Sequence, residues 1–284
     1  MNDSDKIVLD DQILSVVSTL YKGKVIVIKY GGAAMKDSNL TNKVVQNISA
    51  LHNLGIKCVV VHGGGPFINN WLKRLNIKPV FKDGIRVTDS QTMNVVQMVL
   101  AGQINKNIVS MLNTEGLKSV GLSGQDNRLI LVSPSKELQD NRVADVSNIN
   151  IDIIDLLLDN NYIPVIAPIG VSILGKSYNI NADLVAAAIS ERMLAESLIM
   201  LTDTPGILRD RNNPLSTIKK LKIDDAKKLV SDKVIFGGML PKVEACMRVV
   251  SRGVKKATIL DGRIPDSLLL SFLSDSSVST TIEA

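Results

Sequence analysis

Cysteine, histidine and aromatic side chains are scarce in this sequence of 284 residues. It contains two cysteines, Cys58 and Cys246, which are too far apart for a metal-binding motif, and only two histidines. Aromatic residues make up 3% of the chain, so a surface for stacking nucleic-acid bases is poorly supplied. We therefore expect buried free thiols, no metal ligated by the protein and no nucleic-acid partner.

Long apolar runs and a basic leader are also missing. No apolar stretch approaches the ~20 residues that a membrane span requires, and the chain starts with the acidic segment MNDSDKIVLDDQIL. The net charge of +5 suits small anionic ligands at least as well as a polyanion. We expect a soluble protein that makes no contact with a membrane and is not exported through a classical presequence.

The pattern that is present is an alternation of strands and helices. After an amphipathic helix over residues 5–20, it predicts strands at 25–30, 58–61, 119–124, 128–132, 162–170 and 256–260, two strands within 197–210, and helices at 40–54, 66–75, 90–100, 103–114, 151–160, 182–194, 239–252 and 267–273. Such repetition predicts an α/β fold, with a mostly parallel sheet covered by helices on both faces. A boundary between two lobes is expected near 170–175.

One familiar nucleotide motif occurs in the wrong context. The segment GVSILGKS, from Gly170 to Ser177, fits the phosphate-loop pattern, which would make Lys176 a phosphate ligand. The residues before Lys176 are strand-like, however, and YNIN follows in place of a helix. We interpret 171–180 as a β-hairpin. The sequence also has no G-x-G-x-x-G turn opening a helix, and no H-R-D or D-F-G triplet.

Glycine-rich turns follow two of the predicted strands. VIKYGG ends a strand with Lys29 and continues into Gly31 and Gly32, and HGGGP joins a strand to a helix through 63–65. A tight strand–helix turn explains one glycine of this triplet well and three poorly. Backbone N–H groups at such turns can hold a phosphoryl group.

Charged and amide side chains stand at comparable positions elsewhere. Arg86 lies in GIRVTD, Asn179 and Asp183 lie in YNINAD before an alanine-rich helix, and Lys242 begins a helix after Gly237–Gly238. Each alone can be explained by a surface salt bridge, helix capping or solvation. Together with Lys29 and the glycine turns, they suit phosphoryl transfer, in which positioning and charge stabilisation dominate catalysis.

Eight ordered blocks carry a family resemblance along almost the whole chain: VIKYGGAAM, VVVHGGGPFIN, FKDGIRVTD, VGLSGQD, YIPVIAPIG, YNINAD, LTDTPGIL and GGMLPKVEA. This set resembles the acetylglutamate kinases of the amino acid kinase family. The resemblance implies an α/β/α sandwich and the phosphorylation of the side-chain carboxylate of N-acetyl-L-glutamate by ATP, in arginine biosynthesis. Mg²⁺ would accompany the ATP.

The resemblance also implies roles for individual residues. Lys29 and Lys242 would flank the transferred phosphoryl group, and Asp183 would organise them. The substrate would be bound by Gly64, Gly65, Arg86 and Asn179, and the two glycines would also contact the transferred phosphate. The phosphates and the rest of ATP would be bound by Gly31, Gly32, Gly63, Thr202, Asp203, Gly206 and Gly238.

By the same resemblance, the chain divides into three parts. Residues 1–21 would form a helix extension between subunits, 22–175 a lobe for acetylglutamate binding and dimerisation, and 176–284 a lobe for ATP. A dimer or a hexamer built as a trimer of dimers is implied, with arginine as candidate effector and the signalling protein PII as candidate partner. The resemblance also implies a location in the cytoplasm of a prokaryote or, if the protein is plastid-encoded, in the plastid stroma. Departures from arginine-inhibited members at Asp266, Ser271, Ser277 and Ser279 leave arginine inhibition open.

Two other functions compete with this interpretation. The chain could belong to another amino acid kinase, acting on glutamate, aspartate, carbamate or UMP, although HGGG with RVTD disfavours that. It could instead be a catalytically silent subunit that responds to arginine or PII. The presence of Lys29, Asp183 and Lys242 argues against a silent subunit.

Overall fold

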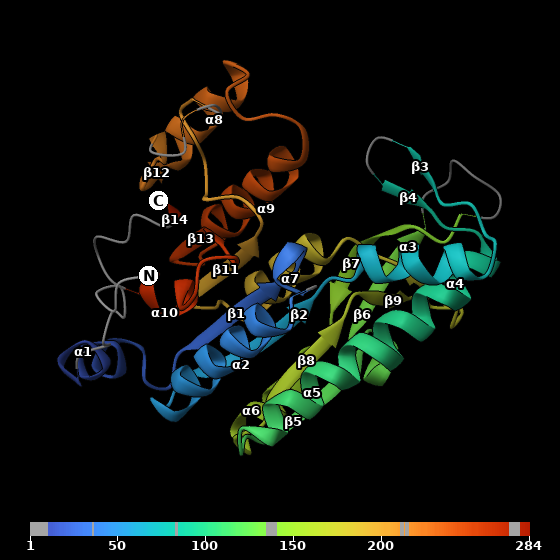
Figure 1. The fold of residues 1–284 in the computed structure, drawn as a ribbon, viewed down its shortest axis with the longest axis horizontal. Helices are drawn as coiled ribbons and strands as arrows, with labels where there is room; N and C mark the ends of the chain where they lie inside the picture. Colours follow the sequence, from blue (N-terminus) through green and yellow to red (C-terminus); the bar gives the residue numbers. More distant parts are fainter. Residues whose placement is uncertain are drawn as a thin grey trace.

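A central sheet of eight strands organises the molecule (Figure 1). The computed structural model describes residues 11–35, 37–82, 85–134, 141–210, 213, 216–272 and 279–284. The strand order is β12 (Lys220–Lys222), β14 (Ser279–Glu283), β13 (Lys256–Asp261), β11 (Ser197–Thr202), β1 (Val25–Tyr30), β2 (Lys57–His62), β8 (Ile163–Ala167) and β5 (Ser119–Ser123). Neighbours run parallel except β13 and β14, so the predicted mostly parallel sheet is confirmed.

Helices cover both faces of this sheet. One face packs against α1 (Asp11–Tyr21), α2 (Ser38–Asn53), α3 (Gly65–Arg74), α4 (Ser90–Gln97), α5 (Asn105–Thr114) and α10 (Ser267–Leu270). The other packs against α6 (Asp152–Asp159), α7 (Ala182–Arg192), α8 (Ile223–Ser231) and α9 (Leu240–Ser251). The α/β/α sandwich is confirmed. No helix in the described part of the chain is both long and apolar enough to cross a membrane.

The central strands are apolar on both sides because they have two covered faces. Val27 and Val59 point into the core beneath α7 and α9, while Ile28 and Val60 point into the core beneath α2 and α5. All four side chains are fully buried. Strands buried on both faces appear in sequence as continuous β-branched runs, which explains why β1 and β2 were easy to predict.

Two smaller sheets lie beside the main one. The first has the order β10 (Ser177–Asn179), β9 (Ile169–Val171), β6 (Ile130–Pro134) and β7 (Ala144–Ile149), and the second pairs β3 (Val80–Lys82) with β4 (Ile85–Val87). β9 and β10 are antiparallel, which confirms the predicted hairpin. No helix begins at Lys176, and the next one, α7, begins at Ala182. The match of GVSILGKS to the phosphate-loop pattern therefore occurs by chance and does not mark a phosphate-binding loop.

Several predicted elements needed correction. The helices predicted at 90–100 and 103–114 are joined by a π-helical segment, Met98–Ile104, so no break occurs at Gly102. The second strand predicted within 197–210 is reduced to a single bridge between Leu208 and Thr217. The last helix ends at Leu270 instead of 273.

The strands β3, β7, β12 and β14 and the helix α8 were not predicted. These strands are short or polar. β14, for example, reads STTIE, yet its first two residues are buried because neighbouring chain covers them. Tertiary contacts outweigh local strand propensity here.

The order of the strands creates a crevice at the centre of the sheet. β1 continues through α2, on one face, to its neighbour β2. The chain after β11 instead passes through β12, α8 and α9 before it enters β13, and both of these helices lie on the opposite face. In open α/β sheets, ligands bind beyond the carboxyl ends of strands where the connections diverge in this way. For this chain, that point follows Tyr30 and Thr202.

Gly206 offers a test of how the unpredicted strand β14 packs. It has φ +102°, and a Cβ there would lie 2.6 Å from Thr280 Oγ1 and 2.9 Å from Thr280 N. Gly23 also has positive φ, but no heavy atom of the described chain lies within 4 Å of its Cβ position. We expect Gly23→Ala to lower the free energy of unfolding by about 1 kcal/mol and Gly206→Ala by about 2–4 kcal/mol, since the clash adds to the backbone strain. Equal losses in urea denaturation would contradict this packing.

Candidate active site

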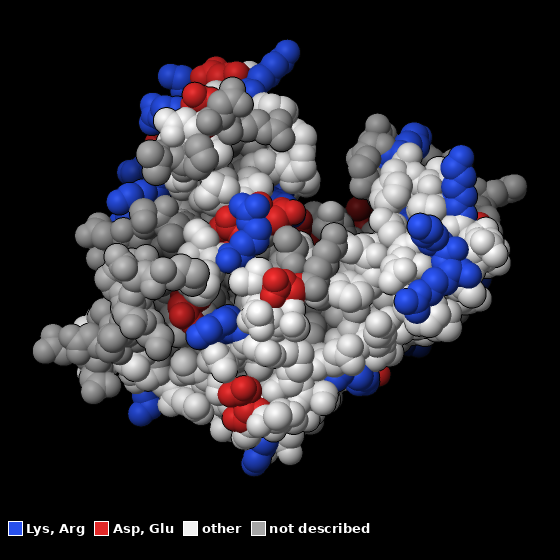
Figure 2. All heavy atoms as spheres, in the orientation of Figure 1, with Lys and Arg blue, Asp and Glu red and all other residues white. Residues whose placement is uncertain are grey.

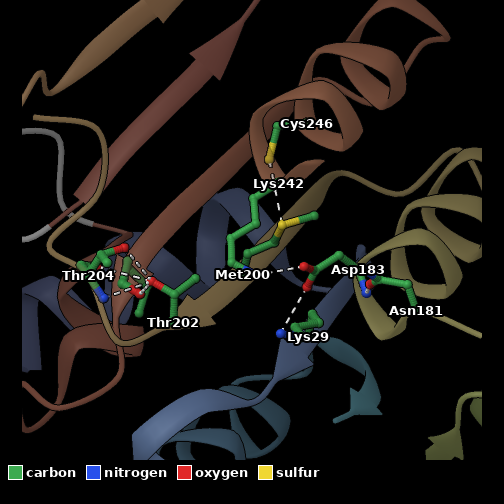
Figure 3. A network of polar contacts seen from close by, with 9 residues as sticks. Lys29, Asn181, Asp183, Met200, Thr202, Thr204, Lys242 and Cys246 are labelled. Atoms are coloured by element: carbon green, nitrogen blue, oxygen red, sulfur yellow. Dashed lines mark hydrogen bonds and ion pairs between the residues drawn. The ribbon is translucent and has the colours of Figure 1, made fainter. Parts of the chain in front are cut away.

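A buried carboxylate joins two lysines at the central crevice (Figure 3). Asp183 Oδ1 lies 2.8 Å from Lys29 Nζ, and Asp183 Oδ2 lies 2.6 Å from Lys242 Nζ. Lys29 comes from the end of β1, Asp183 from the first turn of α7 and Lys242 from the first turn of α9. Three segments that are far apart in sequence thus place two ammonium groups on one carboxylate.

Burial makes this arrangement electrostatically strong. Burial alone would raise the pKa of Asp183, but the charges of Lys29 and Lys242 and their hydrogen bonds outweigh it and lower that pKa to about 2. Burial lowers the pKa of Lys29, and Asp183 opposes this effect. The side chain of Lys242 is the most exposed of the three, at 21%. Asp183 therefore stays ionised at neutral pH, where it bridges the two lysine side chains.

The start of α7 fixes the position of Asp183. Asn181 caps the helix, and its Oδ1 accepts a hydrogen bond of 2.7 Å from the backbone N–H of Asp183. A carboxylate in the first helical turn also interacts favourably with the helix dipole. The sequence indicated both effects as the ordinary explanation for YNINAD. The structure adds the two lysines that meet there.

The first glycine turn packs tightly around this centre. A Cβ on Gly31 would lie 2.7 Å from Lys29 Nζ, so any side chain there would displace the ammonium group. Gly32 has φ +76°, and its Cβ position lies 3.4 Å from the backbone N of Asp203. These two glycines therefore let the turn after β1 pass close to Lys29 and to the end of β11.

The second glycine turn uses its three glycines differently. The N–H of Gly63 donates to the carbonyl of Tyr30 at 2.8 Å and is therefore already paired. A Cβ on Gly64 would lie 2.5 Å from side-chain atoms of Leu100 and Ile104, so helix packing requires glycine there. Gly65 begins α3, where N–H groups have no partner within the helix. The donors that remain for a ligand are those of Gly64 and Gly65.

Arg86 is buried beside α3 with part of its guanidinium unused. Its Nη2 donates to Asn69 Oδ1 at 2.5 Å and to the carbonyl of Gly65 at 3.4 Å, and the group lies 4.7 Å from the ring centre of Phe81. The residue is 7% exposed, and Nη1 is buried without a hydrogen-bond partner in the described chain. An unpaired buried guanidinium nitrogen is costly unless an anionic ligand binds it.

One hydroxyl links Arg86 to Asn179. Thr88 Oγ1 donates to the carbonyl of Arg86 at 3.0 Å and accepts from Asn179 Nδ2 at 3.2 Å. Thr88 is fully buried, and its N–H donates to Asn141 Oδ1. The sequence analysis did not identify Thr88 or Asn69. Asn69 is 17 residues from Arg86 and Thr88 is 91 residues from Asn179, so no short motif indicates either contact. Thr88 does lie within the motif RVTD.

A cleft of about 580 Å³ lies on the Lys242 side of this centre. Its lining includes three residues expected to bind ATP, Asp203, Gly206 and Gly238, together with Ile207, Phe236 and Lys242. Figure 2 shows the molecule hollowed between the part that carries α8 and α9 and the part that carries β3 and β4. Thr202 does not line the cleft; it is buried, and its Oγ1 accepts from the N–H of Thr204. Gly31, Gly32 and Gly63 lie in the turns after β1 and β2.

His62, at the end of β2, was overlooked as a candidate for this site. It is fully buried, with Nδ1 2.9 Å from the carbonyl of Gly63 and Nε2 3.2 Å from Asn105 Nδ2. Burial lowers its pKa to about 4, which the bond to the Gly63 carbonyl only partly offsets. The imidazole is therefore neutral at physiological pH.

Neither cysteine forms a disulfide, and neither belongs to a group of metal-ligating side chains within the described residues. Cys58 and Cys246 are both free and buried, which confirms the expectation from sequence. Within the described ranges, no three His, Cys, Asp or Glu side chains lie close enough to hold a metal ion.

The neutrality of His62 predicts a pH dependence of stability. Its pKa in the folded protein lies below the ordinary value of about 6.5, so its contribution is complete above that pH and is lost as pH falls toward 4. We expect the wild type to lose up to about 3 kcal/mol more than His62→Gln over this range. Denaturant titrations at several pH values measure the difference. Parallel curves for the two proteins would contradict it.

Comparisons with known proteins agree with the fold. The model of the amino acid kinase family matches residues 24–261. An acetylglutamate kinase of Synechococcus sp. (strain CC9311) is 46% identical over 282 residues, 99% of each chain. One of Trichodesmium erythraeum (strain IMS101) is 50% identical over 264 residues, 93% of this chain and 90% of that one.

A solved structure shows the same fold at lower identity. N-acetylglutamate synthase from Neisseria gonorrhoeae, complexed with coenzyme A and N-acetyl-glutamate, has a TM-score of 0.85 at 21% identity. The match covers 99% of this chain and 64% of that chain. Together with the family model and the near full-length relatives, it leads to one conclusion: the chain belongs to the amino acid kinase family, and within it groups with the acetylglutamate kinases.

Proposed function

We propose that the protein transfers the γ-phosphoryl group of ATP to the side-chain carboxylate of N-acetyl-L-glutamate, giving N-acetyl-γ-glutamyl phosphate in arginine biosynthesis. The near full-length acetylglutamate kinase relatives support this substrate. The observation that carries the mechanism is the pair of ammonium groups held on Asp183 at the central crevice.

The reaction needs no general base, because the acceptor carboxylate is already ionised. One carboxylate oxygen forms the new bond to phosphorus, the bond to the β–γ bridging oxygen breaks, and its electron pair leaves with ADP. Negative charge is spread over the transferring group. Lys29 and Lys242 stabilise that charge, while Asp183 keeps both side chains in place.

The two substrates approach this centre from different sides. The unpaired Nη1 of Arg86 binds the α-carboxylate of acetylglutamate, with Asn179 in the same substrate site. The N–H groups of Gly64 and Gly65 face the side-chain carboxylate and the phosphoryl group that it receives. ATP occupies the cleft that Asp203, Gly206 and Gly238 line, with its phosphates toward Lys242 and the turn at Gly31 and Gly32. Mg²⁺ bound to the phosphates would neutralise part of their charge.

We also propose that the chain divides into the three parts 1–21, 22–175 and 176–284. Residues 22–175 carry Arg86, and 176–284 carry the nucleotide cleft. Asn179 lies just beyond the boundary but contacts Thr88 across it. The acetylglutamate site therefore draws on both parts of the chain, with Asn179 as the contribution from beyond residue 175.

Assembly is proposed from the N-terminal extension. Residues 1–10 lie outside the described residues, but α1 exposes Val16 and Leu20 at 57% and 59%. This apolar surface supports packing between subunits, in a dimer or in a hexamer built as a trimer of dimers. Relatives from cyanobacteria support a location in the cytoplasm, and relatives from red algae support a plastid stroma.

We propose arginine and PII as candidate regulators of the enzyme. Of the positions that depart from arginine-inhibited members, Asp266 accepts a hydrogen bond of 2.8 Å from Asn47, and Ser277 lies outside the described residues. Neither observation favours a silent regulatory subunit over a kinase. The paired lysines favour the kinase.

The lysines provide the test of this function. We expect Lys29→Met and Lys242→Met to lower turnover at least about 100-fold, because each removes a charge from the transition state. Turnover is measured by trapping the acyl phosphate as a hydroxamate, with acetylglutamate and with free glutamate, aspartate and carbamate as alternatives. Lys176→Met, in the coincidental phosphate-loop match, is the matched control and should keep wild-type turnover. Near-normal turnover in either crevice variant would refute the assigned roles.

Gly31 tests the position of Lys29 without removing it. Gly31→Ala adds a methyl group 2.7 Å from the Nζ atom, at a residue whose φ does not require glycine. We expect turnover to fall about 10-fold or more, because the displaced ammonium no longer faces the reacting group. Gly65→Ala, with open space around its Cβ, is the steric control for stability measured by thermal unfolding. Unchanged turnover in Gly31→Ala would contradict the tight turn.

A further inference from the structure

The two ring nitrogens of His62 have partners of opposite kind. Nδ1 lies 2.9 Å from the Gly63 carbonyl, which can only accept, so Nδ1 carries the proton and donates. Nε2 lies 3.2 Å from Asn105 Nδ2, which can only donate, so Nε2 accepts. The contacts therefore select one neutral tautomer of the imidazole.

Asn105 is itself fixed by other contacts. Its Nδ2 also donates to the carbonyl of Val165 at 2.8 Å, in the strand next to β2. The residue follows directly on the π-helical segment Met98–Ile104, whose Leu100 and Ile104 side chains would contact a Cβ on Gly64. The same stretch of helix thus supports both His62 and the glycine turn.

The bond from His62 determines which way the next peptide group faces. A peptide unit is planar, and in the trans form its C=O and N–H point in opposite directions. The Gly63 carbonyl faces His62, so the N–H of Gly64 points away from the imidazole. The N–H of Gly63 is bound to Tyr30, which fixes the preceding peptide as well.

We propose that His62 is a positioning residue, which acts through the Gly63–Gly64 peptide to aim the Gly64 N–H at the phosphoryl group during transfer. This inference rests on the proposed function and goes beyond it by assigning a task to a side chain that contacts neither substrate. The donor in this hydrogen bond is the neutral Nδ1–H group of His62, to which we assign no other function. Loss of this bond lets the peptide rotate, and the Gly64 N–H then no longer points at the developing charge.

Three variants of His62 distinguish the effect of its hydrogen bond to Gly63 from the effect of its packing in the buried site. In His62→Asn, the side-chain amide can place an N–H near the former Nδ1 position, whereas His62→Leu fills the site without a donor. His62→Gln places its amide nearer to the former Nε2 position, so it also loses the bond to Gly63. We expect His62→Leu and His62→Gln to lower kcat about 10- to 100-fold with KM values for ATP and acetylglutamate changed less than about 3-fold, and His62→Asn to recover most of the loss.

Measured stability distinguishes a positioning role from a purely structural one. If His62 had only a structural role, the less stable variant would also be the less active one. Asn is small and polar in a fully buried site, so we expect His62→Asn to unfold more readily than His62→Leu. Turnover and stability should therefore rank the two variants in opposite order. If His62→Leu does not fold, His62→Gln serves in the same comparison with His62→Asn.

The failure of this inference differs from the failure of the proposed function. A wild-type protein that makes no hydroxamate from ATP and acetylglutamate overturns both. An active wild type overturns the inference alone if His62→Leu is as active as His62→Asn, if turnover follows stability, or if the loss appears in KM instead of kcat.

Discussion

The contact between Asp183 and the two lysines is the interaction on which the rest of the site depends. Two ammonium groups repel each other, and burying one of them removes it from water. A carboxylate that uses one oxygen for each cation compensates both costs. The result is a fixed pair of positive charges that can act on one phosphoryl group without reorganising during the reaction.

The fold brings these three residues together by its strand order. β1 and β11 are neighbours whose following helices lie on opposite faces, so the turns after them open a crevice instead of a flat surface. Lys29 reaches the crevice along β1, while α7 and α9 direct their first turns toward it. Glycines at 31, 32 and 64 allow the backbone and the helices to approach that closely.

Sequence reasoning succeeded where a signal is local. The double-sided burial of β1 and β2 leaves β-branched runs. Lys29 lies near the end of β1 and the glycine turns follow the two strands directly, so their positions could be predicted. Thr88, Asn69 and Asn105 were missed because their partners lie 17 to 91 residues away in the chain. The strand β14 was missed because its polar residues are buried only by tertiary packing.

The central claim is that both lysines act on the same phosphoryl group. The most direct measurement is a crystal structure with ADP, acetylglutamate and a planar metal fluoride that mimics the transferring group. The account predicts the Nζ atoms of Lys29 and Lys242 both within hydrogen-bond distance of the fluoride ligands, on different sides of the mimic, with Asp183 still between them. A mimic bound elsewhere, or contacted by only one of the two lysines, would contradict it.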